Sequence, residues 1–178
     1  IIFVGRLNYS KGYDIFKDSI IRILDEFPKW NAISLGDEDR RSIYIKHPQH
    51  KELGFLNHKK TLKLLNQSEI AVVPSRWEEP FGRTSLEATS WGCATIISNR
   101  GGLKETTDNA IILKSLNSND LYIEIKKLIT NKKKRTYLQI NGRKNVKHLI
   151  NENTKLIDEI RESCVPFFNI NLLKKKLK

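Results

Sequence analysis

Short, largely apolar segments alternate with single amphipathic segments along this chain, and this alternation restricts the fold more than any other feature. Residues 1–5 (IIFVG) and 69–75 (EIAVVPS) are continuous apolar runs, which is typical of strands buried on both faces of a sheet. Between them, residues 11–27 repeat apolar side chains at helical spacing and stop before Pro28. Strands joined by single helices imply right-handed crossovers, so we expect an α/β fold with a doubly wound, parallel, Rossmann-like sheet.

The same patterns place the other elements and divide the chain. Further strands are expected at 31–36, 51–56, 93–98 and 109–113, and further helices at 58–66, 83–91, 120–130 and 132–150. Polar residues 37–49 and the glycine-bearing segment 99–105 are expected to be loops. We assign one domain to 1–150 and a C-terminal helix with a basic tail to 151–178. Because the first residues already form a strand, we expect the chain to begin inside a longer protein.

The loops after the strands are expected to lie along one edge of the sheet, where open α/β folds bind ligands. The loop Gly5-Arg6-Leu7-Asn8-Tyr9-Ser10-Lys11-Gly12 matches neither GxGxxG nor a P-loop. It offers Arg6, whose planar fork can grip phosphate oxygens, and Lys11, a compact positive charge at the start of a helix. The loop alone is equally consistent with a glycine turn that carries two solvent-facing cations.

Two carboxylates, Glu79 and Glu87, flank a Pro-Phe-Gly turn at the point where an apolar strand is expected to end and a helix to begin. Pro80 fixes φ and Gly82 permits close backbone approach, so the amides around Phe81 to Thr84 can point at a ligand. Such a ligand would be rich in hydroxyls and phosphate, as a nucleotide sugar is. The spacing leaves a second interpretation open for Glu87.

Thr84 and Glu87 also match a capping box, in which the glutamate folds back onto its own helix. The spacing does not choose between this cap and a ribose contact. Glu78, beside Glu79, is interpreted as a spectator on the surface.

Residues 75–105, SRWEEPFGRTSLEATSWGCATIISNRGGLKE, resemble the signature of the retaining glycosyltransferases of family 4 (glycosyl transferases group 1), which have the GT-B fold. GRLNYSKG resembles the phosphate loop of the same family, and 27–37 and 52–75 match its intervening segments in the right order. The resemblance covers roughly residues 1–115. It implies the C-terminal, donor-binding domain of an enzyme that moves a hexose from a nucleotide-diphosphate sugar to a glycan or glycolipid, as in polysaccharide or lipopolysaccharide biosynthesis.

The resemblance also implies roles for individual residues. Arg6 and Lys11 would hold the donor diphosphate and stabilise the departing nucleoside diphosphate, while Glu79 would bind sugar hydroxyls and Glu87 the ribose. Phe55 and Leu56 would border the base. The catalytic residues are then Arg6, Lys11 and Glu79, and the donor-binding set is Gly5, Arg6, Lys11, Phe55, Leu56, Glu79, Pro80, Phe81, Gly82, Arg83, Thr84 and Glu87.

No cofactor and no metal are expected. The family generally works without metal, because cationic side chains and a helix N-terminus stabilise the charge that Mg²⁺ stabilises elsewhere. The sequence agrees, since the four histidines form no ligand set with carboxylates or cysteines. These histidines are His47, His50, His58 and His148.

Three departures from the family pattern and two rival functions bear on this assignment. Residues 38–41 (EDRR) stand where a further glycine is frequent, and Cys93-Ala94 where a proline is frequent. The family's N-terminal acceptor domain is missing, so this piece alone is expected to bind donor weakly and transfer little. The rivals are a glycosidase that uses Glu79 and Glu87 as paired acids, and a non-catalytic remnant or basic interaction domain with the same fold.

The formal net charge of +12 is interpreted first as a solvated basic surface with a basic C-terminal end, and second as attraction to an anionic membrane. Lysines cluster at 132–135 (KKKR) and at Lys174, Lys175, Lys176 and Lys178, which is consistent with a solvated surface or with a peripheral contact to an anionic membrane. Nucleic acid is disfavoured, because no zinc spacing, helix-turn-helix or aromatic–basic interleaving is present. Two cysteines form no disulfide framework and no apolar run is long enough to span a bilayer, so we expect a cytoplasmic location.

Overall fold

The computed structural model describes residues 1–38, 42–106 and 109–164. The chain divides into two compact units, Ile1–Val146 and Lys147–Lys178. In the second unit the described part is the C-terminal portion of one helix. The lysines at 174–178 and the part of the EDRR segment at 39–41 lie outside the described residues.

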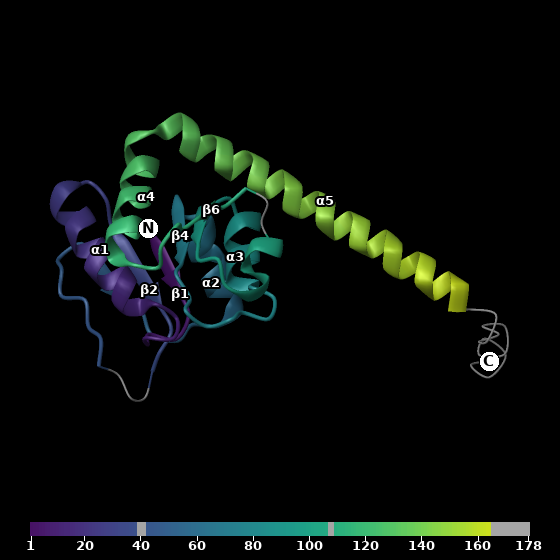
Figure 1. The fold of residues 1–178 in the computed structure, drawn as a ribbon, viewed down its shortest axis with the longest axis horizontal. Coiled ribbons are helices and arrows are strands. Elements are labelled where there is room, and N and C mark those ends of the chain that lie inside the picture. Colours follow the sequence, from purple (N-terminus) through teal and green to yellow (C-terminus); the bar gives the residue numbers. More distant parts are fainter. Residues whose placement is uncertain (39–41, 107–108, 165–178) are drawn as a thin grey trace. The chain divides into compact units, whose positions relative to one another are not determined.

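One parallel sheet forms the centre of the first unit (Figure 1). The strands of the described chain follow the order β3-β2-β1-β4-β5-β6, and every neighbouring pair is parallel. Their bounds are β1 (Ile2–Val4), β2 (Ala32–Leu35), β3 (His50–Glu52), β4 (Ile70–Val73), β5 (Ala94–Ile97) and β6 (Ile111–Ile112). This order is that of the Rossmann fold, and the predicted doubly wound sheet is therefore confirmed.

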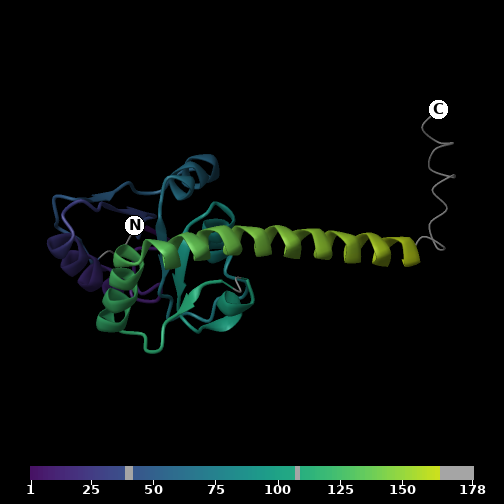
Figure 2. The ribbon, with the colours of Figure 1, turned by 90° about the horizontal axis from the view of Figure 1, so that it is seen from above.

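Helices cover both faces of this sheet. They are α1 (Tyr13–Glu26) and α4 (Ser118–Thr130) on one face, and α2 (His58–Asn66) and α3 (Arg83–Ser90) on the other. A 3₁₀ helix, η1 (Gly101–Glu105), follows β5, and the last helix is α5 (Lys132–Cys164), of which the part up to Val146 belongs to the first unit. Figure 2 shows α2 and α4 on opposite sides of the strands.

The two faces of β1 explain why its sequence is apolar without alternation. Phe3 packs in one core cluster with α1 and α4, including Phe16, while Ile2 packs in another with Leu65 of α2 and Ala88 of α3. Side chains alternate between the faces of a strand, and here each face is covered by a helical layer. Each fully buried large apolar side chain stabilises the fold by about 1.5–3 kcal/mol.

The third strand differs from its predicted position. We expected 51–56, whereas β3 is His50–Glu52 and pairs with the outer edge of β2. Gly54 has φ +64°, which turns the chain out of the sheet. Phe55 and Leu56 therefore lie in the loop that follows the strand, and their apolar character is not that of a buried strand.

Arg135 is not part of a solvated basic cluster, which corrects the interpretation of KKKR as four surface cations. Its side chain is only 9% exposed and donates to the Glu69 carboxylate at 2.8 Å. It also donates to the main-chain oxygens of Leu128 at 2.6 Å and Ile129 at 3.2 Å, at the end of α4. Helix C-termini leave main-chain carbonyls without intrahelical partners, and the Arg135 side chain caps the C-terminus of α4 by bonding to two of them.

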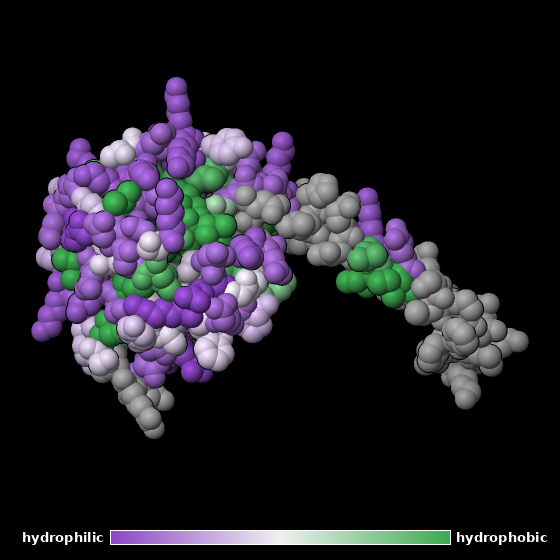
Figure 3. Space-filling model, in the orientation of Figure 1, coloured by the Kyte–Doolittle hydropathy of each residue, from purple (hydrophilic) through white to green (hydrophobic). Residues whose placement is uncertain are grey.

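The surface of the first unit is otherwise strongly polar. Figure 3 shows one face on which hydrophilic side chains cover most of the area. Lys132, Lys133 and Lys134, the neighbours of Arg135, are exposed. Among the described residues, no helix is both long and apolar enough to cross a membrane.

Candidate functional site

The strand order places the candidate site between β1 and β4. These central strands pair with each other, yet the chain leaves β1 for α1 on one face and β4 for α3 on the other. The loops after them therefore separate, which leaves a crevice at the carboxyl edge of the sheet. The residues singled out from the sequence come from the loops along this edge.

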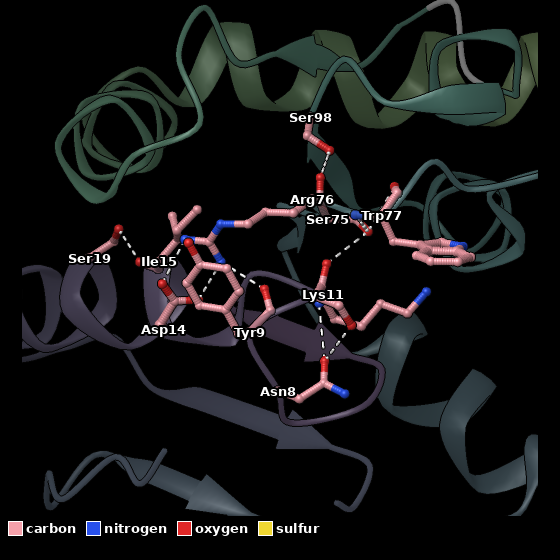
Figure 4. Close-up of polar contacts among 11 residues, drawn as sticks. Asn8, Tyr9, Lys11, Asp14, Ile15, Ser19, Ser75, Arg76, Trp77 and Ser98 are labelled. Carbon is pink, nitrogen blue, oxygen red and sulfur yellow. Dashed lines mark hydrogen bonds and ion pairs between the residues drawn. The ribbon is translucent and has the colours of Figure 1, made fainter. Parts of the chain in front are cut away.

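The loop after β1 is held in one conformation by its own polar groups. The Asn8 Oδ1 atom accepts from the Lys11 main-chain N–H at 3.1 Å and from the Ser10 hydroxyl at 2.9 Å (Figure 4). Gly12 follows at φ +71°, and a Cβ there would lie 2.0 Å from the Pro74 main-chain oxygen. Only glycine permits this contact between the loops after β1 and β4, and it fixes where Lys11 enters the site.

Arg76 joins the same two loops, and sequence reasoning missed it. Its guanidinium donates two hydrogen bonds to the Asp14 carboxylate, at 2.6 and 2.7 Å, and lies 3.6 Å from the centre of the Tyr9 ring. The main-chain N–H of Arg76 donates to the Ser10 oxygen at 2.8 Å. Figure 4 shows the Tyr9 ring packed on this arginine. The pair joins residues 62 apart, so no local pattern could have revealed it.

Lys11 and Glu79 meet in the crevice. The Lys11 Nζ atom donates to Glu79 Oε1 at 2.5 Å, and the two side chains are 28% and 16% exposed. Both line a cavity of about 100 Å³, together with Gly5, Gly82 and Thr84. The structure thus brings together the predicted residues of the loops after β1 and β4, over 68 residues of sequence.

Glu78, interpreted from the sequence as a spectator, has a structural task. Its carboxylate accepts from the main-chain N–H of Gly101 at 2.5 Å and from the Arg100 guanidinium at 3.0 Å. These contacts, from Arg100 first and then from the Gly101 amide, hold the pKa of Glu78 below its usual value. Glu78 therefore attaches the loop after β5 to the loop that carries Glu79.

Gly101 and Gly102 let these loops pack main chain against main chain. The main-chain N–H of Gly102 donates to the main-chain oxygen of Glu79 at 2.7 Å. Gly101 has φ +52°, and a Cβ at this position would lie 2.3 Å from the same oxygen. A side chain at Gly101 would displace Glu79, which explains why the loop carries glycine here.

The capping-box interpretation of Glu87 is wrong. Helix α3 begins at Arg83, its N-cap is Gly82 with φ +73°, and no side chain caps it. Thr84 is thus already inside the helix, and Glu87 bonds elsewhere, to His58 Nε2 at 3.1 Å and Arg83 at 3.4 Å. The first amides of α3 receive no side-chain cap, and the positive end of the helix dipole faces the crevice.

A second cavity, of about 420 Å³, adjoins the first and shares Val4, Gly5 and Arg83 with it. It lies at the ends of β1, β2 and β3, and its lining includes Arg6, Phe55, Leu56 and His58. The Phe55 ring is 77% exposed, which leaves its face accessible. Pro80 and Phe81 are exposed on the turn before α3 and line neither cavity.

Within the described residues, no group of three or more metal-binding side chains is assembled. His47 contacts Asp25, His50 is buried against the Ser34 hydroxyl, and His58 contacts Glu87. The side chain of His148 lies outside the part of the structure that is described.

Comparison with known proteins identifies relatives of the chain. The family model "Glycosyl transferases group 1" matches residues 1–145. Spore coat protein SA of Bacillus subtilis is 29% identical over 155 residues, which cover 78% of this chain and 41% of that protein. An uncharacterized glycosyltransferase of Methanocaldococcus jannaschii is 31% identical over 156 residues, covering 82% and 40%.

Among solved structures, the fold is similar to that of Anabaena HepE in complex with UDP-glucose. The TM-score is 0.74 at 21% identity, and the match covers 90% of this chain and 48% of HepE. The likeness at this identity concerns the fold alone. The chain spans about two fifths of the length of the two curated relatives named above.

Proposed function

Because this chain belongs to the glycosyl transferases group 1 family, we propose that its first compact unit binds the donor of a hexosyl transfer reaction. The donor would be a nucleotide-diphosphate sugar and the acceptor a glycan or glycolipid. The observation that carries the proposal is the crevice between β1 and β4, where Lys11, Glu79 and the uncapped start of α3 surround one cavity.

The two adjoining cavities suggest how such a donor lies. The base would occupy the larger cavity against Phe55 and Leu56. The diphosphate would cross Gly5, where the cavities meet, within reach of Arg6 and Lys11. The sugar would then enter the smaller cavity beside Glu79, and the ribose would lie on the side of Glu87. HepE, which has the same fold, binds UDP-glucose.

The charges of the crevice suit departure of a nucleoside diphosphate. As the glycosidic bond breaks, negative charge accumulates on the leaving phosphate, where Arg6, Lys11 and the amides at the start of α3 supply positive potential. Lys11 is held by Glu79 and the amides are held by helix α3 before the donor arrives, so these two groups need little rearrangement in the transition state. We propose that Arg6, Lys11 and these amides stabilise the charge that Mg²⁺ stabilises in metal-dependent enzymes. We also propose that the transfer retains the anomeric configuration of the sugar, as in family 4.

The arrangement of the acids favours this proposal over a glycosidase. A retaining glycosidase needs two carboxyl groups that face one bond about 5–5.5 Å apart. Here Glu79 pairs with Lys11 in the smaller cavity, whereas Glu87 pairs with His58 and Arg83 and lines neither cavity. We propose that both acids position the donor and that neither attacks it.

Donor binding can be tested by calorimetric titration with UDP-, GDP- and ADP-glucose and the free diphosphates. We expect one of the three bases to bind, and Arg6→Ala to weaken its diphosphate by roughly 10–150-fold, because a hydrogen bond to a charged group is worth about 1.5–3 kcal/mol. Arg143→Ala is the matched control, since Arg143 is an exposed arginine in the first part of α5. Equal losses in the two variants, or no binding of any diphosphate, would refute the proposed donor site.

A further inference from the structure

A basic groove lies on the outer side of α2, apart from the donor crevice. We define it by Lys59, Lys60, Lys63, Leu62 and Trp91, which line a shallow depression of about 540 Å³. It shares no lining residue with either cavity of the candidate site. Figure 2 shows α2 at the outside of its layer.

Helical spacing puts the three lysines on the solvent side of α2. The inward residues of the helix are Thr61 and Leu65, which are buried, whereas all three lysines are exposed. None of them forms an ion pair with a carboxylate of the described residues, and no carboxylate lines the groove. The charge of the groove is thus not neutralised within the described part of the chain.

The floor of the groove is apolar, in contrast to its rim. Leu62 is half-buried, and Trp91, at the end of α3, is 37% exposed. No described residue accepts a hydrogen bond from the Trp91 indole N–H. Tryptophan is enriched where a protein meets a membrane surface, because its ring is apolar while its N–H can bond to water and head groups.

We propose that this groove is a docking surface for an anionic phospholipid bilayer. The lysines would contact head-group phosphates while Trp91 and Leu62 enter the boundary between head groups and acyl chains. A polyanion such as nucleic acid would satisfy the lysines but leaves the apolar floor without a role, so the membrane is the favoured partner. The proposal is independent of donor binding, because the groove and the crevice share no lining residue.

The size of the electrostatic contribution follows from the three lysines. A basic residue close to an anionic membrane strengthens binding by about fivefold, so the set should contribute on the order of 100-fold at low salt. Exposed charges are screened beyond about 8–10 Å at physiological salt, so this contribution should fall as salt is raised.

The test is co-sedimentation of the full chain with vesicles of phosphatidylcholine, alone or mixed with phosphatidylglycerol. We expect binding only to the mixed vesicles, and a loss on the order of 100-fold for the triple variant Lys59→Gln, Lys60→Gln, Lys63→Gln. The matched control is Lys132→Gln, Lys133→Gln, Lys134→Gln, which removes the same charge from exposed positions at the start of α5. It should retain most of the binding.

Tryptophan fluorescence supplies a second measurement that does not depend on charge. Brominated lipids should quench part of the emission of the bound wild-type chain, and Trp91→Phe should abolish that quenching while leaving the thermal midpoint close to that of the wild type. The proposal is overturned if the two triple variants lose binding equally, if the wild type fails to bind the mixed vesicles, if quenching persists in Trp91→Phe, or if a DNA oligonucleotide binds at the groove more tightly than the vesicles do.

Discussion

Replacing Arg135 by methionine should destabilise the first unit far more than a surface substitution does. The change removes the donor for the main-chain oxygens of Leu128 and Ile129 and for the Glu69 carboxylate. The buried Leu128 carbonyl, left without this partner, costs about 1–3 kcal/mol, whereas the part-buried Ile129 carbonyl can bond to water instead. Glu69 is 54% exposed, so the lost ion pair itself adds at most about 1 kcal/mol.

These contributions sum to about 1–4 kcal/mol for Arg135→Met, and methionine adds little to this cost because it preserves much of the apolar contact of the arginine stem. For a domain of this size, 1 kcal/mol shifts the thermal midpoint by about 2–4 °C, so a decrease of roughly 2–16 °C is expected. Urea unfolding followed by circular dichroism measures the free-energy change directly. Lys134→Met is the control, since it places the same side chain at an exposed neighbour. If the free energies of unfolding of the two variants agree within about 0.5 kcal/mol, Arg135 does not cap the C-terminus of α4.

Three further predictions concern the site and its support. Gly101→Ala should weaken donor binding by at least about tenfold, because its Cβ would lie 2.3 Å from the main-chain oxygen of Glu79. Gly92→Ala is the control, since Gly92 also has a positive φ, +89°, but no atom lies within 4 Å of a Cβ there. Equal effects of the two variants in calorimetric titrations would contradict this prediction. The bonds from Arg100 and a main-chain amide lower the pKa of Glu78, so the stability it contributes is present above its usual value of 4.5 and is lost as the pH falls through the lower folded pKa. The difference in thermal midpoint between wild type and Glu78→Gln should therefore shrink in acid, and a constant difference would argue against the bond. Burial raises the pKa of the Cys93 thiol to about 12. Iodoacetamide at pH 8 should therefore alkylate Cys93 in the folded chain on the order of 1,000-fold more slowly than in the urea-unfolded chain. Peptide mass spectrometry measures both rates, and similar rates would refute the burial of Cys93.

The sequence predicted the order of the elements and the two loops that bring Lys11 and Glu79 together, whereas the predicted site residues Pro80, Phe81 and Glu87 line neither cavity. Both faces of the strands Ile2–Val4 and Ile70–Val73 are covered, so their side chains are all apolar, and this uninterrupted apolar run is enough to predict that they are buried strands. Glycines mark the main-chain contacts that define the site, and Gly12 and Gly82 lie in the left-handed region at the start of α1 and α3. These are local signals, and local patterns predict local structure well.

Contacts between distant segments could not be predicted in this way. Arg135 follows three lysines and looks like a fourth surface cation, and its burial depends on Glu69 and on the end of another helix. Arg76 lies in the loop after β4 and likewise depends on Asp14, which belongs to α1. The capping box failed for a related reason, since Gly82 starts α3 earlier than Thr84 would. In each case a tertiary contact or a backbone angle outweighed a plausible local pattern.

The central claim, that Lys11 and Glu79 form the diphosphate and sugar ends of one donor site, is tested most directly by titrating Glu79→Gln. The carboxylate competes with a donor phosphate for Lys11, to which it is bonded at 2.5 Å. The variant should therefore bind the best free nucleoside diphosphate as well as the wild type or more tightly. It should bind the corresponding diphosphate-glucose about 10–150-fold less tightly, since it loses a charged acceptor for sugar hydroxyls. An equal loss for both ligands, or an unchanged affinity for the sugar donor, would contradict the account.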